Sequence, residues 1–236
     1  MDLRPPFPAD FRLFLASQSP RRHSLLRDIA VPYEVVTTDG EEATGGGTAV
    51  ALAAANAMAK VRHAALPRAP LAGAFVLGTD TLVTLAGRVM GKPSSRPDAR
   101  AMIAALSGET HQVISGVALR RIGCDGEPAA GSGPAHARTP ALGGPGATGA
   151  GPGEMLRVVT ARTDVTFLRL EETQIEAYIA SGEWSDKAGA YGVQGLAGTF
   201  VSEIRGEYSN VVGLPLCLLA RLFREAGFDL LRRQWL

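Results

Sequence analysis

Cysteine is scarce in this chain of 236 residues, and neither cysteine belongs to a metal-binding or redox motif. Cys124 and Cys217 form no C-x-x-C pair and no zinc-finger spacing, which excludes a disulfide framework or a structural zinc site as the basis of the fold. The four histidines show no H-E-x-x-H spacing, so the sequence also lacks the common zinc-hydrolase motif. Free cysteines are typical of the reducing cytoplasm, where we expect this protein to be.

The sequence also lacks a charge excess and a long apolar run. Its 24 basic and 23 acidic residues give a formal net charge of +1, which excludes a strongly basic nucleic-acid binder. No stretch approaches the roughly 20 apolar residues of a membrane helix, and the first residues lack the apolar segment of a signal peptide. We therefore expect no membrane partner and no nucleic-acid partner. The length and the 46% hydrophobic content are sufficient for one large core or two small ones.

Residues 123–154 differ in composition from the rest of the chain, because they are mostly Gly, Pro and Ala without an apolar period. Such a segment buries too little surface to offset its ordering entropy, and we expect a disordered surface loop. The flanking residues 110–121 and 156–170 both have strand patterns. A hairpin with an expanded turn is therefore favoured over a linker between two independent domains.

Predicted strands and helices alternate along the remaining chain. Ser19 and Pro20 are typical of an N-cap and a first helical position, and Ala86-Gly87 indicates a hairpin turn. Further strands are predicted at residues 12–16, 75–78, 81–85 and 88–90, and helices at 20–28, 48–66, 97–106, 171–181 and 215–226. This order predicts an α/β fold with a mixed sheet.

The segment Ser17-Gln18-Ser19-Pro20-Arg21-Arg22 is a candidate anion site. A strand ends here and a helix begins, so free N–H groups and the helix dipole favour a negative charge. Two arginines in the first turn oppose that dipole, and a bound phosphate would compensate them. The alternative is an ordinary helix start with two solvated arginines.

Asp80 follows the apolar strand of residues 75–78, where α/β proteins commonly place groups that face a ligand. A carboxylate at this place can hold a divalent metal or take a proton from water. The alternative is an aspartate that closes a turn through local hydrogen bonds.

Three further polar residues are candidates for ligand binding. Lys60 lies in an alanine-rich helix, and Lys92 stands between a glycine and a proline; either lysine could instead be a solvated charge or, for Lys60, a partner of the helix dipole. The glycine-rich stretch 182–215 carries Gln194, whose amide offers one donor and one acceptor edge to a pyrimidine. Glycine-rich stretches can also be plain turns.

Taken together, these segments resemble the Maf family of nucleoside triphosphate pyrophosphatases. The matching motifs occur in family order and are Leu15-Ala16-Ser17 with Ser19-Pro20-Arg21-Arg22, Gly78-Thr79-Asp80-Thr81, Gly91-Lys92-Pro93, Leu106-Ser107-Gly108 with His111, Asp186-Lys187-Ala188-Gly189-Ala190-Tyr191-Gly192-Val193-Gln194-Gly195, and Val211-Val212-Gly213-Leu214-Pro215. The resemblance implies an elongated, twisted mixed sheet with flanking helices and a cleft between two lobes, similar to inosine triphosphate pyrophosphatases. It implies one catalytic domain over residues 12–236, preceded by an extension, residues 1–11, whose first ten residues we expect to be mobile.

The resemblance also implies the reaction and the site. Enzymes of this family hydrolyse a nucleoside triphosphate to the monophosphate and pyrophosphate with a divalent metal, Mg²⁺ or Mn²⁺, and the run from Asp186 to Gly195 is similar to that of the dTTP/UTP subgroup. The resemblance implies that Asp80 is the catalytic residue and a metal ligand, and that the acidic pair Glu41-Glu42, with Glu41 preferred, adds a further metal ligand. It implies phosphate binding for Arg21, Lys60 and Lys92 and substrate binding for Ser17. The choice of base is implied for Arg21, Thr81 and Gln194.

Two alternatives stay open at this point. One keeps the chemistry but takes 7-methyl-GTP or a modified nucleotide as substrate. The other is a regulatory protein of septum formation that acts by binding a partner, although no basic stripe supports it. A homodimer is compatible with either, because the sequence does not determine the oligomeric state.

Overall fold

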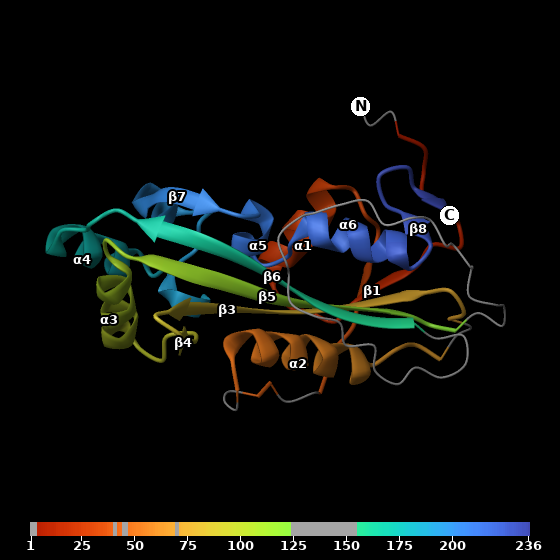
Figure 1. Ribbon diagram of the computed structural model, residues 1–236, viewed down its shortest axis with the longest axis horizontal. Helices are drawn as coiled ribbons and strands as arrows, with labels where there is room; N and C mark the ends of the chain where they lie inside the picture. The colour runs from red at the N-terminus through yellow and green to blue at the C-terminus, as the bar shows by residue number, and fades with distance from the viewer. Residues whose placement is uncertain (1–3, 40–41, 44–46, 69–70, 124–154) are drawn as a thin grey trace.

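The computed structural model describes residues 4–39, 42–43, 47–68, 71–123 and 155–236, and a seven-stranded sheet forms its centre (Figure 1). Its strands are β1 (Leu13–Leu15), β2 (Glu34–Val35), β3 (Phe75–Leu85), β4 (Arg88–Met90), β5 (Thr110–Arg121), β6 (Met155–Phe167) and β7 (Val201–Arg205). The helices are α1 (Pro20–Asp28), α2 (Ala49–Arg62), α3 (Arg96–Leu106), α4 (Glu172–Ser181), α5 (Tyr208–Val212) and α6 (Leu216–Glu225), with short 3-10 turns η1 (Ala188–Ala190) and η2 (Leu196–Phe200). A small ribbon of β8 (Phe228–Asp229) and β9 (Gln234–Trp235) follows α6.

The sheet is mixed, as the sequence predicts. In the order β2-β1-β3-β5-β6-β7, β1 is parallel to both of its neighbours, whereas the later pairs are antiparallel. Strands β5 and β6 pair without a break from Thr110↔Thr166 to Arg121↔Met155, which confirms the predicted hairpin. The segment 124–154, predicted to be a disordered loop, lies outside the described residues.

The prediction of two separate strands at 75–78 and 81–85 is wrong, because β3 runs continuously from Phe75 to Leu85. Pairing with β5 extends from Phe75 to Thr84, and the two threonines that flank Asp80 are β-branched residues that suit a strand. Asp80 therefore lies in the middle of a strand and not at its end.

The other edge of β3 is only partly occupied. Strand β1 pairs with residues 75–77 and β4 with residues 83–85, and β5 already occupies the opposite edge. Among the described strands, none pairs with residues 78–82 on this edge. The sheet thus leaves a gap beside β3 that is centred on Asp80.

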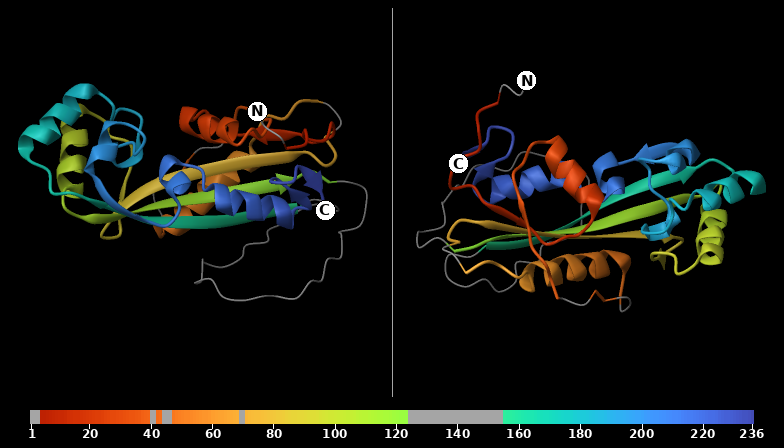
Figure 2. Two further views of the ribbon diagram at one scale, coloured as in Figure 1. Left: turned by 90° about the horizontal axis from the view of Figure 1, so that it is seen from above. Right: turned by 180° about the vertical axis from the view of Figure 1, so that it is seen from behind.

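Helix α2 covers one face of the sheet, and α1, α5 and α6 cover the other (Figures 1 and 2). Two glycines allow α2 to approach closely. A Cβ on Gly78 would lie 2.6 Å from the carbonyl oxygen of Ala57, and a Cβ on Gly116 would overlap the carbonyl of Ala53. The backbone of α2 therefore lies against β3 and β5 at a depth that larger residues would prevent.

Two apolar clusters support the two ends of the elongated molecule. One includes Phe75, Phe223 and Phe228 and lies under α1 and α6. The other includes Phe167 and Ile179 and lies between the far end of the sheet, α3 and α4. These clusters correspond to the two predicted lobes.

The sequence predicts a mobile N-terminal segment, but residues 4–10 pack against the rest of the structure. Phe7 stacks on Phe228 with ring centroids 6.0 Å apart, and the Pro5 carbonyl accepts a hydrogen bond from Arg233 at 2.9 Å. Trp235 donates its indole N–H to Asp10 at 3.2 Å. These contacts come from the C-terminal ribbon, so the two ends of the chain lie side by side in the fold.

In the described part of the chain, no helix is long and apolar enough to cross a membrane.

Candidate active site

A cavity of about 810 Å³ lies beside the unpaired edge of β3. It is lined from both lobes and from both helical layers, by the β1–α1 turn, by α2, by the turn after β4 and by the loop before η2. The lining includes the predicted site residues Ser17, Arg21, Lys60, Asp80, Thr81, Lys92 and Gln194. The structure thus brings together all of the predicted site residues except Glu41, which lies outside the described residues.

Asp80 is buried, and its two carboxylate oxygens are held by α2. Oδ1 accepts a hydrogen bond from Lys60 Nζ at 2.9 Å, and Oδ2 accepts one from Asn56 Nδ2 at 3.0 Å. The side chains of Asn56 and Lys60 meet the same carboxylate because residues four apart share one face of a helix. Each carboxylate oxygen keeps a lone pair free, so Asp80 can still accept from water or bind a cation.

Lys60 is surrounded by oxygen atoms. Its ammonium contacts Asp80, the carbonyl of Thr79 at 3.1 Å and Glu42 Oε1 at 2.7 Å. These three acceptors match the three N–H donors of an ammonium group. A phosphate can therefore reach Lys60 only by replacing an acceptor, and Glu42, whose side chain is 53% exposed, is the one that can turn away.

Glu42 and Asp80 form the oxygen pair that a divalent cation could use. Both carboxylates contact the Lys60 ammonium, so they lie side by side in the cavity, although the ammonium itself occupies the point between these two oxygens. Mg²⁺ typically takes one or two protein carboxylates and completes its shell with water and substrate phosphates. Among the described residues no cluster of three or more His, Cys, Asp or Glu side chains forms a dedicated metal cage. The donor set fits a cation that is shared with the substrate.

Arg22 lies at the floor of the cavity with 9% of its surface exposed. Its guanidinium donates to the carbonyl of Gly213 at 2.9 Å, to Ser17 Oγ at 2.9 Å and to Thr81 Oγ1 at 3.1 Å. Burial lowers the pKa of Arg22 to about 10, and the neighbouring Arg21 contributes in the same direction. The group remains charged near pH 7, yet in the described part of the chain no carboxylate pairs with it directly.

Arg21 faces the cavity mouth and is paired. Its Nη1 lies 2.9 Å from Asp186 Oδ2, so the first turn of α1 is tied to the loop that carries Gln194. Burial acts to raise the pKa of Asp186, but hydrogen bonds from Lys187 and Arg21 outweigh it and lower the pKa overall. Ser19 occupies the N-cap position as predicted, but its side chain makes no capping bond.

Lys92 and Gln194 are the exposed members of the site. No hydrogen bond of either side chain is found among the described residues. Both project from loops, Lys92 after β4 and Gln194 before η2, and both remain available to a ligand.

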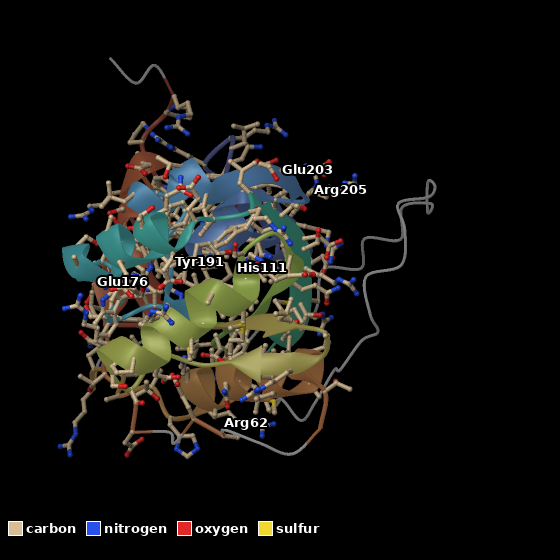
Figure 3. The ribbon with its side chains drawn as sticks, turned by 90° about the vertical axis from the view of Figure 1, so that its left-hand side faces the viewer. Arg62, His111, Glu176, Tyr191, Glu203 and Arg205 are labelled. Carbon is tan, nitrogen blue, oxygen red and sulfur yellow. The ribbon has the colours of Figure 1, made fainter. Side chains whose placement is uncertain are left out.

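A buried pair lies behind the loop. His111 Nε2 and the Tyr191 hydroxyl are 2.7 Å apart, and Figure 3 shows the two side chains next to each other. Burial lowers the pKa of His111 to about 4, so the imidazole is neutral near pH 7. Burial also raises the pKa of Tyr191, which keeps its hydroxyl protonated. This pair attaches the loop to β5.

The sequence placed Arg22 beside Arg21 in the candidate anion site, but it gave no separate role to Asn56 or Asp186. A signal existed for Asn56, because it is a polar residue four positions before Lys60 in an apolar helix. Arg22 also had a local signal, as the second of two arginines in the first turn of α1, and one of its partners, Ser17, lies five residues away. For Asp186 no local signal existed, since its partner Arg21 is 165 residues away in the chain.

Comparison with known proteins shows relatives over most of this chain. The family model described as Maf-like protein matches residues 12–226. A dTTP/UTP pyrophosphatase of Anaeromyxobacter dehalogenans (strain 2CP-C) is 41% identical over 219 residues, which cover 93% of this chain and 96% of that protein. Proteins with the same name in Chromobacterium violaceum and in Bacillus cereus (strain AH187) are 38% and 36% identical, over 94% and 92% of this chain and 98% and 97% of theirs.

The match covers both lobes and every element that lines the cavity. The chain therefore belongs to the Maf-like protein family.

Proposed function

We propose that this protein hydrolyses dTTP and UTP to the nucleoside monophosphate and pyrophosphate. The observation that carries the proposal is a buried carboxylate, Asp80, in one cavity with five basic side chains, Arg21, Arg22, Lys60, Lys92 and Lys187. A triphosphate carries about four negative charges near neutral pH, and phosphoryl-transfer enzymes act mainly by positioning and by neutralising such charge. The names of the relatives support pyrimidine triphosphates as substrates.

The chain's own groups suggest how the reaction proceeds. Asp80 accepts a hydrogen bond from the water that attacks the α-phosphorus and can take its proton. Arg22 donates to a phosphate oxygen and gains the anionic partner that its burial otherwise denies it. Lys60 and Lys92 bind the remaining phosphate oxygens. Gln194 hydrogen-bonds to the pyrimidine edge, and Thr81 and Arg21 contribute to the choice of base.

A divalent metal completes this proposal, with Mg²⁺ or Mn²⁺ held by Asp80 and Glu42. When bound, the cation supplies positive charge that offsets the charge developing on the phosphate oxygens. Glu42 belongs to the acidic pair that the resemblance implies as a source of an added metal ligand, and its carboxylate contacts Lys60 beside Asp80. Removal of the metal by EDTA should abolish pyrophosphate release, and added Mg²⁺ or Mn²⁺ should restore it.

The cavity takes residues from Ala16 to Gly213, which supports residues 12–236 as a single catalytic unit. Nothing in the arrangement favours the alternative of a regulatory protein that acts by binding alone.

The test is pyrophosphate release from dTTP, UTP, CTP, GTP and 7-methyl-GTP, with wild type and Asp80→Asn. We expect preference for dTTP and UTP, and a loss of at least about 10²-fold in kcat for Asp80→Asn, because a positioned general base typically contributes that much. Asp28→Asn, an exposed change outside the cavity, is the matched control. Release from 7-methyl-GTP alone would reject the pyrimidine substrate, and full activity of Asp80→Asn would remove Asp80 from the mechanism.

A further inference from the structure

Gln194 is held by a tight turn and not by contacts of its own side chain. The Gly195 N–H donates to the Gly192 carbonyl at 3.1 Å, so Val193 and Gln194 are the two central residues of a β-turn. Val193 packs partly buried against both apolar clusters, whereas Gln194 is exposed in the cavity. The position of the Gln194 amide therefore depends on what fixes the turn.

Glu183 fixes one end of this turn. Its Oε2 accepts a hydrogen bond from the Leu196 N–H at 2.8 Å, directly after the turn. A Cβ on Gly195 would overlap the Glu183 carboxylate, so the carboxylate lies flat against the backbone of Gly195. Only a glycine permits that approach.

Lys187 fixes the other end. A Cβ on Gly192 would lie 2.7 Å from Lys187 Cε, so the lysine stem lies against the start of the turn. The ammonium of Lys187 donates to the Glu183 carbonyl and to Asp186 Oδ1. Glu183 and Lys187, four residues apart in the chain, therefore contact the two ends of the turn from Gly192 to Gly195.

Glu183 does not line the cavity, in contrast to Lys187 and Gln194. Its second oxygen, Oε1, is buried and accepts no hydrogen bond from the described residues. Burial of a carboxylate oxygen without a hydrogen-bond partner lowers the stability of the fold. The hydrogen bond that Glu183 does make goes to the backbone of the turn.

We propose that Glu183 is a positioning residue that determines the base preference of the site through Gln194. The inference rests on the proposed function for the identity of the base. A free amide can present either its carbonyl or its NH₂ group, and so can match the uracil edge or the cytosine edge. Discrimination requires that the amide stay at one distance and one height relative to the ring, because specificity is a difference between two binding energies. The Glu183 bond to Leu196 supplies that constraint.

The experiment measures base preference in binding, so that it does not depend on turnover. The α,β-imido analogues of dUTP and dCTP, which resist hydrolysis, are titrated calorimetrically in Mg²⁺ into wild type, Glu183→Ala, Glu183→Gln and Gln194→Ala. Glu203→Ala is the matched control, since this exposed glutamate forms its ion pair within the described residues with Arg205 on β7, at the surface in Figure 3.

We expect wild type to prefer the dUTP analogue and Glu183→Ala to lose about tenfold of that preference, the size of one charge-assisted hydrogen bond. Glu183→Gln should recover most of it, because its amide oxygen can still accept from Leu196 N–H. In a Gln194→Ala background, Glu183→Ala should cause no further loss, since residues that act through one another are not additive. Gly195→Ala, which displaces the same carboxylate from the other side, should reproduce the loss if Glu183→Ala does not fold.

An unchanged preference in Glu183→Ala and Gly195→Ala overturns the inference, and so does a further loss in the Gln194→Ala background. A wild type that binds both analogues equally also overturns it, even where pyrophosphate release succeeds. A wild type with base preference but without pyrophosphate release overturns the proposed function and leaves the role of Glu183 to be decided by the binding data.

Discussion

Replacing Gly78 by alanine perturbs the depth at which α2 lies on the sheet. The added Cβ would lie 2.6 Å from the Ala57 carbonyl oxygen and 2.8 Å from Val61 Cγ2, both of which are buried parts of the helix. To reach an ordinary contact of 3.4 Å, the helix must retreat by roughly 0.8 Å. Lys60 and Asn56 would retreat with it.

This displacement is large for the site. The Lys60–Asp80 and Asn56–Asp80 bonds, at 2.9 and 3.0 Å, would lengthen beyond hydrogen-bond range. Misplacement of a catalytic group by about 1 Å can cost about 10²-fold in rate, and overpacking of this kind costs about 1–3 kcal/mol of unfolding free energy. For a chain of this size, 2 kcal/mol corresponds to a decrease in Tm of about 4–8 °C.

The assay is pyrophosphate release from dTTP together with thermal unfolding. Gly91→Ala is the control for stability alone, because a Cβ at Gly91 meets no atom within 4 Å. A Gly78→Ala protein with the wild-type Tm and kcat/KM would show that α2 does not need this depth, and the argument that links the glycine to Asp80 would be wrong.

Three other changes test separate parts of the structure. His111→Gln should remove a pH dependence of the unfolding free energy. Burial lowers the pKa of His111 from 6.5 to about 4, so below pH 6.5 the unfolded chain binds a proton that the folded protein does not. The contribution of the neutral imidazole to stability is therefore complete above pH 6.5 and is lost as the pH falls towards 4. Wild type should then lose about 3 kcal/mol more unfolding free energy than the variant between these pH values, measured by urea titration, and parallel losses would contradict the assignment. Arg22→Lys should lower kcat/KM by at least about tenfold, because an ammonium cannot reproduce the planar fork that binds Ser17, Thr81 and Gly213, whereas Arg27→Lys at the exposed end of α1 should change little. Deletion of residues 125–152 should leave turnover nearly unchanged, since Arg121 and Met155 already pair across the sheet, and a large loss would show that the segment contributes to the site.

Local signals predicted most of the elements. Pro20 marks the first residue of α1, and Ala86 and Gly87 form the hairpin turn with positive φ. These features depend on a few neighbouring residues, whose backbone preferences a sequence displays directly.

The errors arose where distant segments decide. The continuity of β3 through Asp80 depends on its pairing with β5, about 35 residues further along the chain. The packing of residues 4–10 depends on the C-terminal ribbon, which supplies Arg233 and Trp235. Neither partner is visible in the local pattern.

The candidate site shows the same division. The sequence by itself determined which residue types are available, and its resemblance to the Maf family implied Asp80, Lys60 and Gln194 as members of one site. Only the tertiary structure determined which of the neighbours Arg21 and Arg22 is buried. Arg21 pairs with Asp186 at the mouth of the cavity, and Arg22 is buried at its floor. Successive side chains on a helix point about 100° apart, so adjacent arginines face different surroundings, and the packing of α1 against Gly213 determines which one is buried.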